Sequence, residues 1–191
     1  MSAATNRRRP LTLADLTERE HTALRLCVHE AAHSVVGVVM GGRLSTAVVG
    51  GGRVTGVQGA TLFADMSTGR HPVVALAGPY GEARWAADCR RPTVWEVDAV
   101  LAGGGRKDHA AIIAAGSSVP EVSGELAGLV ERCWPSVVTV AQQLYRTGEV
   151  FHADVCAALG IPATGNSLHL SLIRSGAAPG SFTVTPAATG D

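Results

Sequence analysis

Two different periods of apolar and polar positions run along this chain. Between residues 11 and 42 the apolar side chains recur every three or four residues, the spacing of one face of an α-helix. They include Leu24, Val28, Ala31, Ala32, Val35 and Val39. Thr17 or Asp15 is placed to cap the start of this helix, and the pair Gly41 and Gly42 is placed to end it. The pattern therefore predicts one long early helix.

The middle of the chain changes period twice. Residues 43–65 hold Val, Thr and Gly in short runs, which favours two or three short strands joined by glycine turns. Residues 71–88 return to helical spacing with Pro72 near the start. A proline-containing loop is expected over 89–98, and a glycine-rich turn running into a short helix over 102–116.

The last part of the chain is helical and then polar. Residues 120–148 predict two helical pieces that are broken or kinked at Pro135, and residues 152–160 predict a last short helix. From about Pro162 onward Gly, Ser, Thr, Pro and Ala dominate, which is typical of a flexible tail. Within that tail the alternation of residues 167–173 also fits a stray strand.

These elements predict a mainly α fold with a small β-sheet (α+β): a long early helix, short strands, and then a C-terminal helical bundle. We expect a disordered N-terminal tail over residues 1–14, one domain over 15–163, and a flexible tail over 164–191.

Composition excludes several classes of function. Sixteen basic residues balance sixteen acidic ones, so the charge gives no argument for binding nucleic acid or an anionic membrane. No apolar run reaches the roughly 20 residues of a membrane span, and no signal peptide is visible, so we expect a cytoplasmic protein. The four cysteines are scattered without a C-x-x-C pair, which favours reduced and mostly buried thiols.

The candidate chemistry lies within the predicted early helix. His29, Glu30 and His33 form the pattern H-E-x-x-H. Residues four apart project from the same face of a helix, so the two imidazoles can bind one Zn²⁺ from the same side. The glutamate between them is then placed to act as a general base on water at the metal.

A catalytic zinc site needs a third protein ligand. No histidine follows the motif within residues 34–44, and each remaining histidine taken alone is more typical of a core or surface position. Glu82, within the second predicted helix, and Asp108, after the glycine-rich turn, are the two candidate acids. The residues by themselves leave this choice open.

Three segments, in order, resemble the FtsH-type zinc metallopeptidases, a family with a zincin-like helix. HEAAHSVVGVVM resembles the family's HEAGH helix, ALAGPYGEARWA its LAGRxAE helix, and AGGGRKDHAAIIAA the segment that carries its aspartate ligand. With the closing helices, the resemblance covers about residues 17–162. It implies that Zn²⁺ is held by His29, His33 and Asp108, and that Glu82 is not a ligand but supports the helix packing.

The chain departs from the family's pattern at several positions. Ala32 replaces the glycine of HEAGH, Pro79 replaces the arginine of LAGRxAE, and Arg106 with Lys107 replaces the Ser-Asn pair before the aspartate. No G-x-x-x-x-G-K-[ST] phosphate-binding loop is present, so the family's ATPase half is not expected here.

The resemblance implies a zinc-dependent metalloendopeptidase that cleaves unfolded or extended polypeptides, with Glu30 as the catalytic base and a separate ATPase or adaptor as a potential partner. Two alternatives remain. One is a catalytically weak or inactive zinc-binding domain that serves as a binding or regulatory module. The other is a helical interaction domain without a metal.

Overall fold

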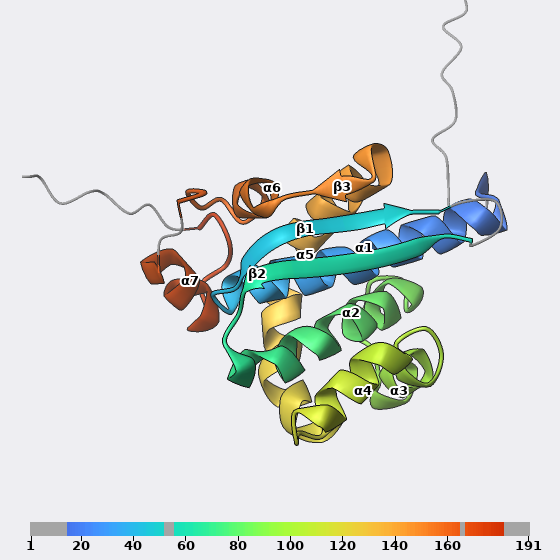
Figure 1. Cartoon of the computed structure of the whole chain (residues 1–191), viewed down its shortest axis with the longest axis horizontal. Coiled ribbons are helices and arrows are strands. Elements are labelled where there is room, and N and C mark those ends of the chain that lie inside the picture. Colours follow the sequence, from blue (N-terminus) through green and yellow to red (C-terminus); the bar gives the residue numbers. More distant parts are fainter. Residues whose placement is uncertain (1–14, 52–55, 165–166, 182–191) are drawn as a thin grey trace, which may run out of the picture.

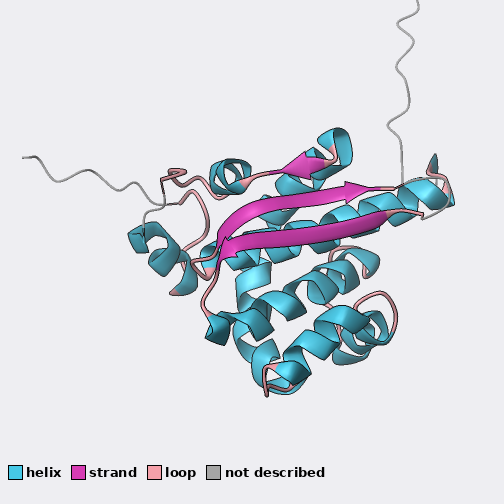
Figure 2. Cartoon of the chain, viewed as in Figure 1, coloured by secondary structure: helices cyan, strands magenta, loops and turns pink. Residues whose placement is uncertain are grey.

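The computed structural model describes residues 15–51, 56–164 and 167–181. This part of the chain forms seven α-helices and one small antiparallel sheet (Figures 1 and 2). The predicted fold class, mainly α with a small β-sheet, is confirmed. The N-terminal tail expected over residues 1–14 lies outside the described residues.

Helix α1 (Glu18–Val39) is the central element of the fold. Thr17 caps its start: the Thr17 side chain accepts from the backbone N–H of Glu20, and the Thr17 backbone N–H donates to the Glu20 carboxylate at 2.8 Å. From residue 27 to residue 40 every side chain is buried. Alanine, valine and glycine dominate this stretch, so the sheet, α2 and α5 can all approach the helix closely.

The sheet has the strand order β2-β1-β3. Strands β1 (Arg43–Gly50) and β2 (Gln58–Asp65) pair antiparallel and run along α1 in Figure 1. Of the two or three short strands expected over residues 43–65, the described residues form two. A two-residue strand, β3 (Glu149–Val150), pairs with β1 and was not predicted. Strand β2 forms the opposite edge of the sheet from β3.

Three further helices follow the sheet in the chain: the first packs against α1, and the other two pack against the first. They are α2 (His71–Ala86), α3 (Val94–Ala102) and α4 (Arg106–Ala114). Helix α2 runs through Pro79, and α4 begins directly after the predicted glycine turn. The loop expected over residues 89–98 is only partly correct, because α3 begins at Val94 behind a capping box of Thr93 and Glu96.

Residues 120–148, predicted as two helical pieces broken or kinked at Pro135, belong to one helix, α5 (Val119–Thr147), so the break is absent. Helix α5 runs for 29 residues without a break at Pro135. An interior proline costs about 3 kcal/mol in an isolated helix. Here the residues on both sides, Cys133, Trp134, Ser136 and Val137, are buried. This packing outweighs the local loss, since most helix stability in proteins comes from tertiary contacts.

The chain closes with α6 (His152–Ala158) and α7 (Ser167–Arg174). The prediction of a stray strand over residues 167–173 was wrong, because these residues form α7. His169 and Ile173 are four residues apart and both buried, so the burial follows the spacing of a helix and not the alternation of a strand. Arg174 Nη1 donates to Val39 O at 2.6 Å, which ties this part of the expected tail to the end of α1.

Two expectations from composition can be compared with the structure: the state of the cysteines and the presence of a membrane span. Cys27, Cys133 and Cys156 are buried and Cys89 is exposed, and all four are free thiols. Among the described residues, no helix has the length and apolar character to cross a membrane.

Candidate metal centre

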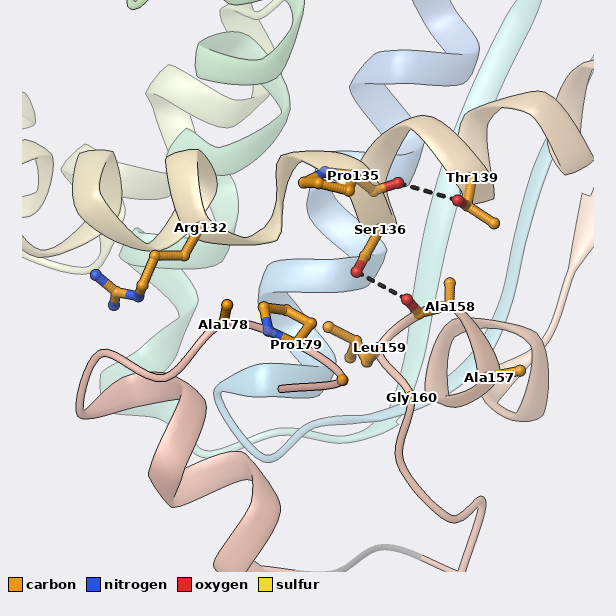
Figure 3. A pocket seen from close by; sticks show the side chains of 11 residues that line it. Arg132, Pro135, Ser136, Thr139, Ala157, Ala158, Leu159, Gly160, Ala178 and Pro179 are labelled. Atoms are coloured by element: carbon orange, nitrogen blue, oxygen red, sulfur yellow. Dashed lines mark hydrogen bonds between the residues drawn. The ribbon is translucent and has the colours of Figure 1, made fainter. Parts of the chain in front are cut away.

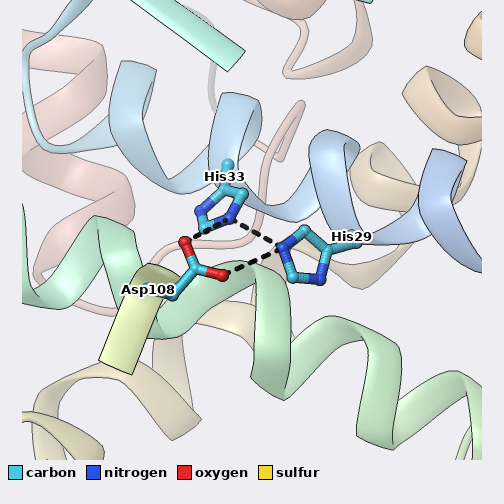
Figure 4. Close-up of side chains that lie close together, drawn as sticks. All are labelled: His29, His33 and Asp108. Carbon is cyan, nitrogen blue, oxygen red and sulfur yellow. Dashed lines mark hydrogen bonds and ion pairs between the residues drawn. The ribbon is translucent and has the colours of Figure 1, made fainter. Parts of the chain in front are cut away.

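Three side chains from two helices that are far apart in the sequence lie close together in space (Figure 4). Helix α1 presents His29 and His33 one turn apart, and α4 presents Asp108 from its first turn. The two Nε2 atoms are 3.0 Å apart. Asp108 Oδ2 lies 3.3 Å from His29 Nε2, and Asp108 Oδ1 lies 3.3 Å from His33 Nε2.

These spacings fit a single tetrahedral ion. Zinc–nitrogen and zinc–oxygen bonds of about 2.0–2.1 Å place neighbouring ligand atoms about 3.3 Å from one another. In this cluster the two nitrogens are 3.0 Å apart, and each lies 3.3 Å from a different oxygen of Asp108, which is close to that separation. Two imidazoles and one carboxylate also form a donor set typical of catalytic zinc.

A glycine of α2 leaves the space beside the two imidazoles open. A Cβ atom at Gly78 would lie 2.3 Å from His33 Nε2 and 2.6 Å from His29 Nε2. Both distances are too short for any side chain to be accommodated there. The absence of a side chain at Gly78 is therefore a steric requirement for the observed positions of both nitrogens.

Helix α2 also orients both imidazole rings through their second nitrogen. His29 Nδ1 donates to Glu82 Oε2 at 2.9 Å, and His33 Nδ1 donates to Val74 O at 2.7 Å. Arg25 Nε in turn lies 3.4 Å from Glu82 Oε1. When both rings are neutral and Nδ1 is the donor, the Nε2 lone pairs are available to a metal.

The charges in the cluster favour a cation. Burial, the largest single influence, lowers the pKa of His29, but its hydrogen bonds with Asp108 and Glu82 and the nearby negative charges together raise it to about 9. Burial raises the pKa of Asp108, but the hydrogen bonds from His29 and His33 hold that pKa well below its usual range. At neutral pH a metal ion binding here displaces the proton on His29 and meets an ionised carboxylate.

Glu30 lies on the same turn of α1 and contacts the sheet. Its carboxylate Oε2 accepts a hydrogen bond from Thr61 Oγ1 on β2 at 2.6 Å. Its backbone oxygen accepts from Ser34 Oγ at 2.7 Å. Glu30 is 6% exposed, so β2 covers the residue that the sequence predicts as the base.

The structure separates the two candidate third ligands by position. Asp108 faces the Nε2 atoms of His29 and His33, whereas Glu82 contacts the opposite nitrogen of His29. Five further histidines take no part in the cluster. They are His21, His71, His109, His152 and His169.

Three contributors to the site were missed by sequence reasoning. Gly78, Thr61 and the backbone oxygen of Val74 all act through tertiary contacts. Only Gly78 carried a sequence signal, because an isolated glycine inside a helical pattern often marks a close approach of another element.

A separate cavity of about 270 Å³ lies between α5 and the segments 157–160 and 178–180 (Figure 3). Ser136 Oγ donates to Ala158 O, and Thr139 Oγ1 donates to Pro135 O, so both hydroxyls of this cavity are already used within the protein. None of the residues of the metal cluster lines it. Among the described residues, the candidate functional site is therefore the cluster of His29, His33 and Asp108.

Comparison of the sequence with known protein families and with curated proteins finds no match.

Proposed function

We propose that the chain is a zinc-dependent metalloendopeptidase. The observation that carries the proposal is the convergence of His29, His33 and Asp108 at zinc-ligand spacing, with Glu30 adjacent in the same helix turn. A buried group of two imidazoles and a carboxylate is costly unless it is paired or binds a cation.

The contact between α1 and α2 supports the resemblance to FtsH-type peptidases. Ala32 stands where that family has glycine, and Gly81 stands where the LAGRxAE pattern has alanine. A Cβ atom at Gly81 would lie 2.6 Å from the Ala32 Cβ atom, so only one of the two positions can carry a methyl group. This chain exchanges the two residues and keeps the close approach of the helices.

In this proposal Glu30 moves the proton. A zinc ion held by His29, His33 and Asp108 would supply a Lewis acid and lower the pKa of water in the site toward about 7. Glu30 Oε2 is engaged by Thr61, which leaves Oε1 to accept a proton from the attacking water. The same oxygen then donates the proton to the nitrogen of the leaving amine. Asp108 would stay ionised as a ligand, because a carboxylate must be deprotonated to hold the metal.

The substrate we propose is an extended or unfolded polypeptide. Strand β2 lies at the edge of the sheet and contacts Glu30 through Thr61. An extended peptide can add to such an edge through backbone hydrogen bonds, which gives binding with little dependence on sequence. Leu62 on this strand is 57% exposed and offers an apolar contact to a substrate side chain.

Metal analysis and proteolysis together test the proposal. We expect one zinc per chain in the wild type, loss of zinc in Asp108→Ala, and retention of zinc in Asp98→Asn, a matched change of an exposed acid on α3. Casein should be cleaved by the wild type. Glu30→Gln should keep zinc and lose cleavage, since general-base catalysis contributes about 10²–10⁴-fold. A wild type without zinc contradicts the proposal.

The burial of Glu30 favours one second candidate, a zinc-binding domain without catalysis. A base that is 6% exposed and covered by β2 is less accessible to water and substrate than a base in an open cleft. This candidate expects zinc in the wild type, no cleavage of casein, and no difference in activity between wild type and Glu30→Gln.

A further inference from the structure

The position of the Glu30 carboxylate is set from the neighbouring strand β2. The hydroxyl of Thr61 donates to Glu30 Oε2 at 2.6 Å and also lies 3.3 Å from the backbone oxygen of Glu30. A hydrogen bond to an ionised carboxylate is shorter and stronger than one between neutral groups. One threonine therefore contacts both the side chain and the backbone of this residue.

A second residue of the same strand shapes the space around the carboxylate. A Cβ atom at Gly59 would lie 2.5 Å from Glu30 Oε1 and 2.7 Å from Glu30 Cγ. Gly59 and Thr61 are two residues apart, so they face the same side of β2. Together they hold one oxygen of Glu30 and leave room for the other.

We propose that Thr61 is a positioning residue for Glu30 and that Gly59 provides the space this position requires. The catalytic consequence of this inference rests on the peptidase function proposed above, whereas the contact itself does not. A glutamate side chain has three rotatable bonds, and a general base must lie within hydrogen-bond reach of the proton that it takes. The bond from Thr61 removes that freedom and fixes which oxygen is free.

Kinetics on the zinc-loaded protein with casein test the catalytic consequence. Thr61→Val keeps the shape but removes the hydroxyl, and we expect kcat to fall about tenfold or more with KM nearly unchanged. Thr61→Ser should restore most of kcat, because it returns the donor. Thr46→Val is the matched control, since Thr46 on β1 donates to the exposed Glu149 at 2.9 Å and should leave kcat unchanged. Zinc content should be the same in all four proteins.

Gly59→Ala adds a test that does not depend on Thr61. The methyl group should displace Glu30 and lower kcat while zinc is retained, whereas Gly50→Ala on β1, where a Cβ meets nothing within 4 Å, should change neither. Wild-type kcat in both Thr61→Val and Gly59→Ala overturns the proposal. If Thr61→Val does not fold, the kcat values of the other two variants decide. A near wild-type kcat in Thr61→Ser with a lowered kcat in Gly59→Ala supports the proposal, and wild-type kcat in Gly59→Ala contradicts it.

Urea unfolding of the metal-free protein tests the contact without zinc or substrate. The midpoint shifts of Thr61→Val and Glu30→Ala should be clearly non-additive, because the two changes remove one shared hydrogen bond. Additive shifts contradict the positioning role. If the wild type cleaves no casein but the shifts are non-additive, the proposed function fails and the Thr61–Glu30 contact stands.

Discussion

The two helices that supply the metal cluster differ sharply in how they are held. Helix α1 is buried on every side from residue 27 to residue 40, between the sheet, α2 and α5. Helix α4, which carries Asp108, has a single buried residue, Ile112. Its start contacts α2 closely, because a Cβ atom at Gly105 would lie 3.1 Å from Pro79 Cγ. Two candidate ligands thus come from the core and the third from a peripheral helix.

This difference indicates how the site is assembled. The imidazoles of His29 and His33 are oriented by packing and by hydrogen bonds to α2. Asp108 depends on a helix with few buried contacts, and such segments open locally at low free energy. A bound ion would therefore connect a rigid element to a weakly held one.

The largest effect should come from the glycine beside the two imidazoles. Gly78→Ala places a methyl group where His29 and His33 now lie, so we expect zinc affinity to fall by more than about 100-fold, beyond the loss typical of an outer contact. Titration with zinc against a competing chelator measures this. Gly124→Ala in α5 is the control: its Cβ meets nothing within 4 Å, and affinity should not change. Unchanged affinity in Gly78→Ala would show that α1 does not depend on this close approach.

Without metal, the amide hydrogen-exchange rates of α1 and α4 should differ. Without zinc we expect the amides of α4 to exchange by local opening, and those of residues 27–40 only on global unfolding. Zinc at 100 times its Kd should slow the exchange of α4 about 100-fold, toward the rate of α1, because binding suppresses openings that break the site. Exchange in α4 that is insensitive to zinc would contradict the third-ligand assignment of Asp108.

Replacing Glu82, the hydrogen-bond partner of His29, should lower zinc affinity moderately. Glu82→Gln weakens the hydrogen bond to His29 Nδ1, and we expect zinc affinity to fall about 10–100-fold. Arg25→Gln, one step further out and half exposed, should have a smaller effect in the same direction. The matched control is Glu125→Gln, where an exposed glutamate pairs with Arg70. A complete loss of zinc in Glu82→Gln, with zinc retained in Asp108→Ala, would reverse the ligand choice.

The smallest effect should be on stability, measured by a double-mutant cycle at the contact between α1 and α2. Gly81→Ala should destabilise the protein by about 1–3 kcal/mol, because two methyl groups cannot occupy the space shared with Ala32. Ala32→Gly alone should cost about 1 kcal/mol through helix propensity. The double variant should return close to wild-type stability, since it moves the methyl group from one helix to the other. Denaturant unfolding measures all three, and additive effects would argue against a shared contact.

Prediction of the elements succeeded where the signal is local. The cap at Thr17 and the glycines after α1 define that helix through the nearest neighbours in the chain. The strand suggested for residues 167–173 and the break suggested at Pro135 are absent, because the conformation of both segments depends on burial against distant segments. Ile173 is fully buried, and the residues that flank Pro135 are packed into the core. A local pattern carries no information about such contacts.

The candidate site divides in the same way. The spacing of His29, Glu30 and His33 determines by itself that two imidazoles share one helix face, because the geometry of an α-helix is local and nearly invariant. The choice between Asp108 and Glu82 stayed open at the level of the residues, since each acid lies far from the motif in sequence. Only the packing of α4 and α2 against α1 decides which acid faces the Nε2 atoms and which contacts the opposite ring nitrogen. For the same reason Gly78 and Thr61 become visible only in three dimensions: their roles lie in what approaches them from another element.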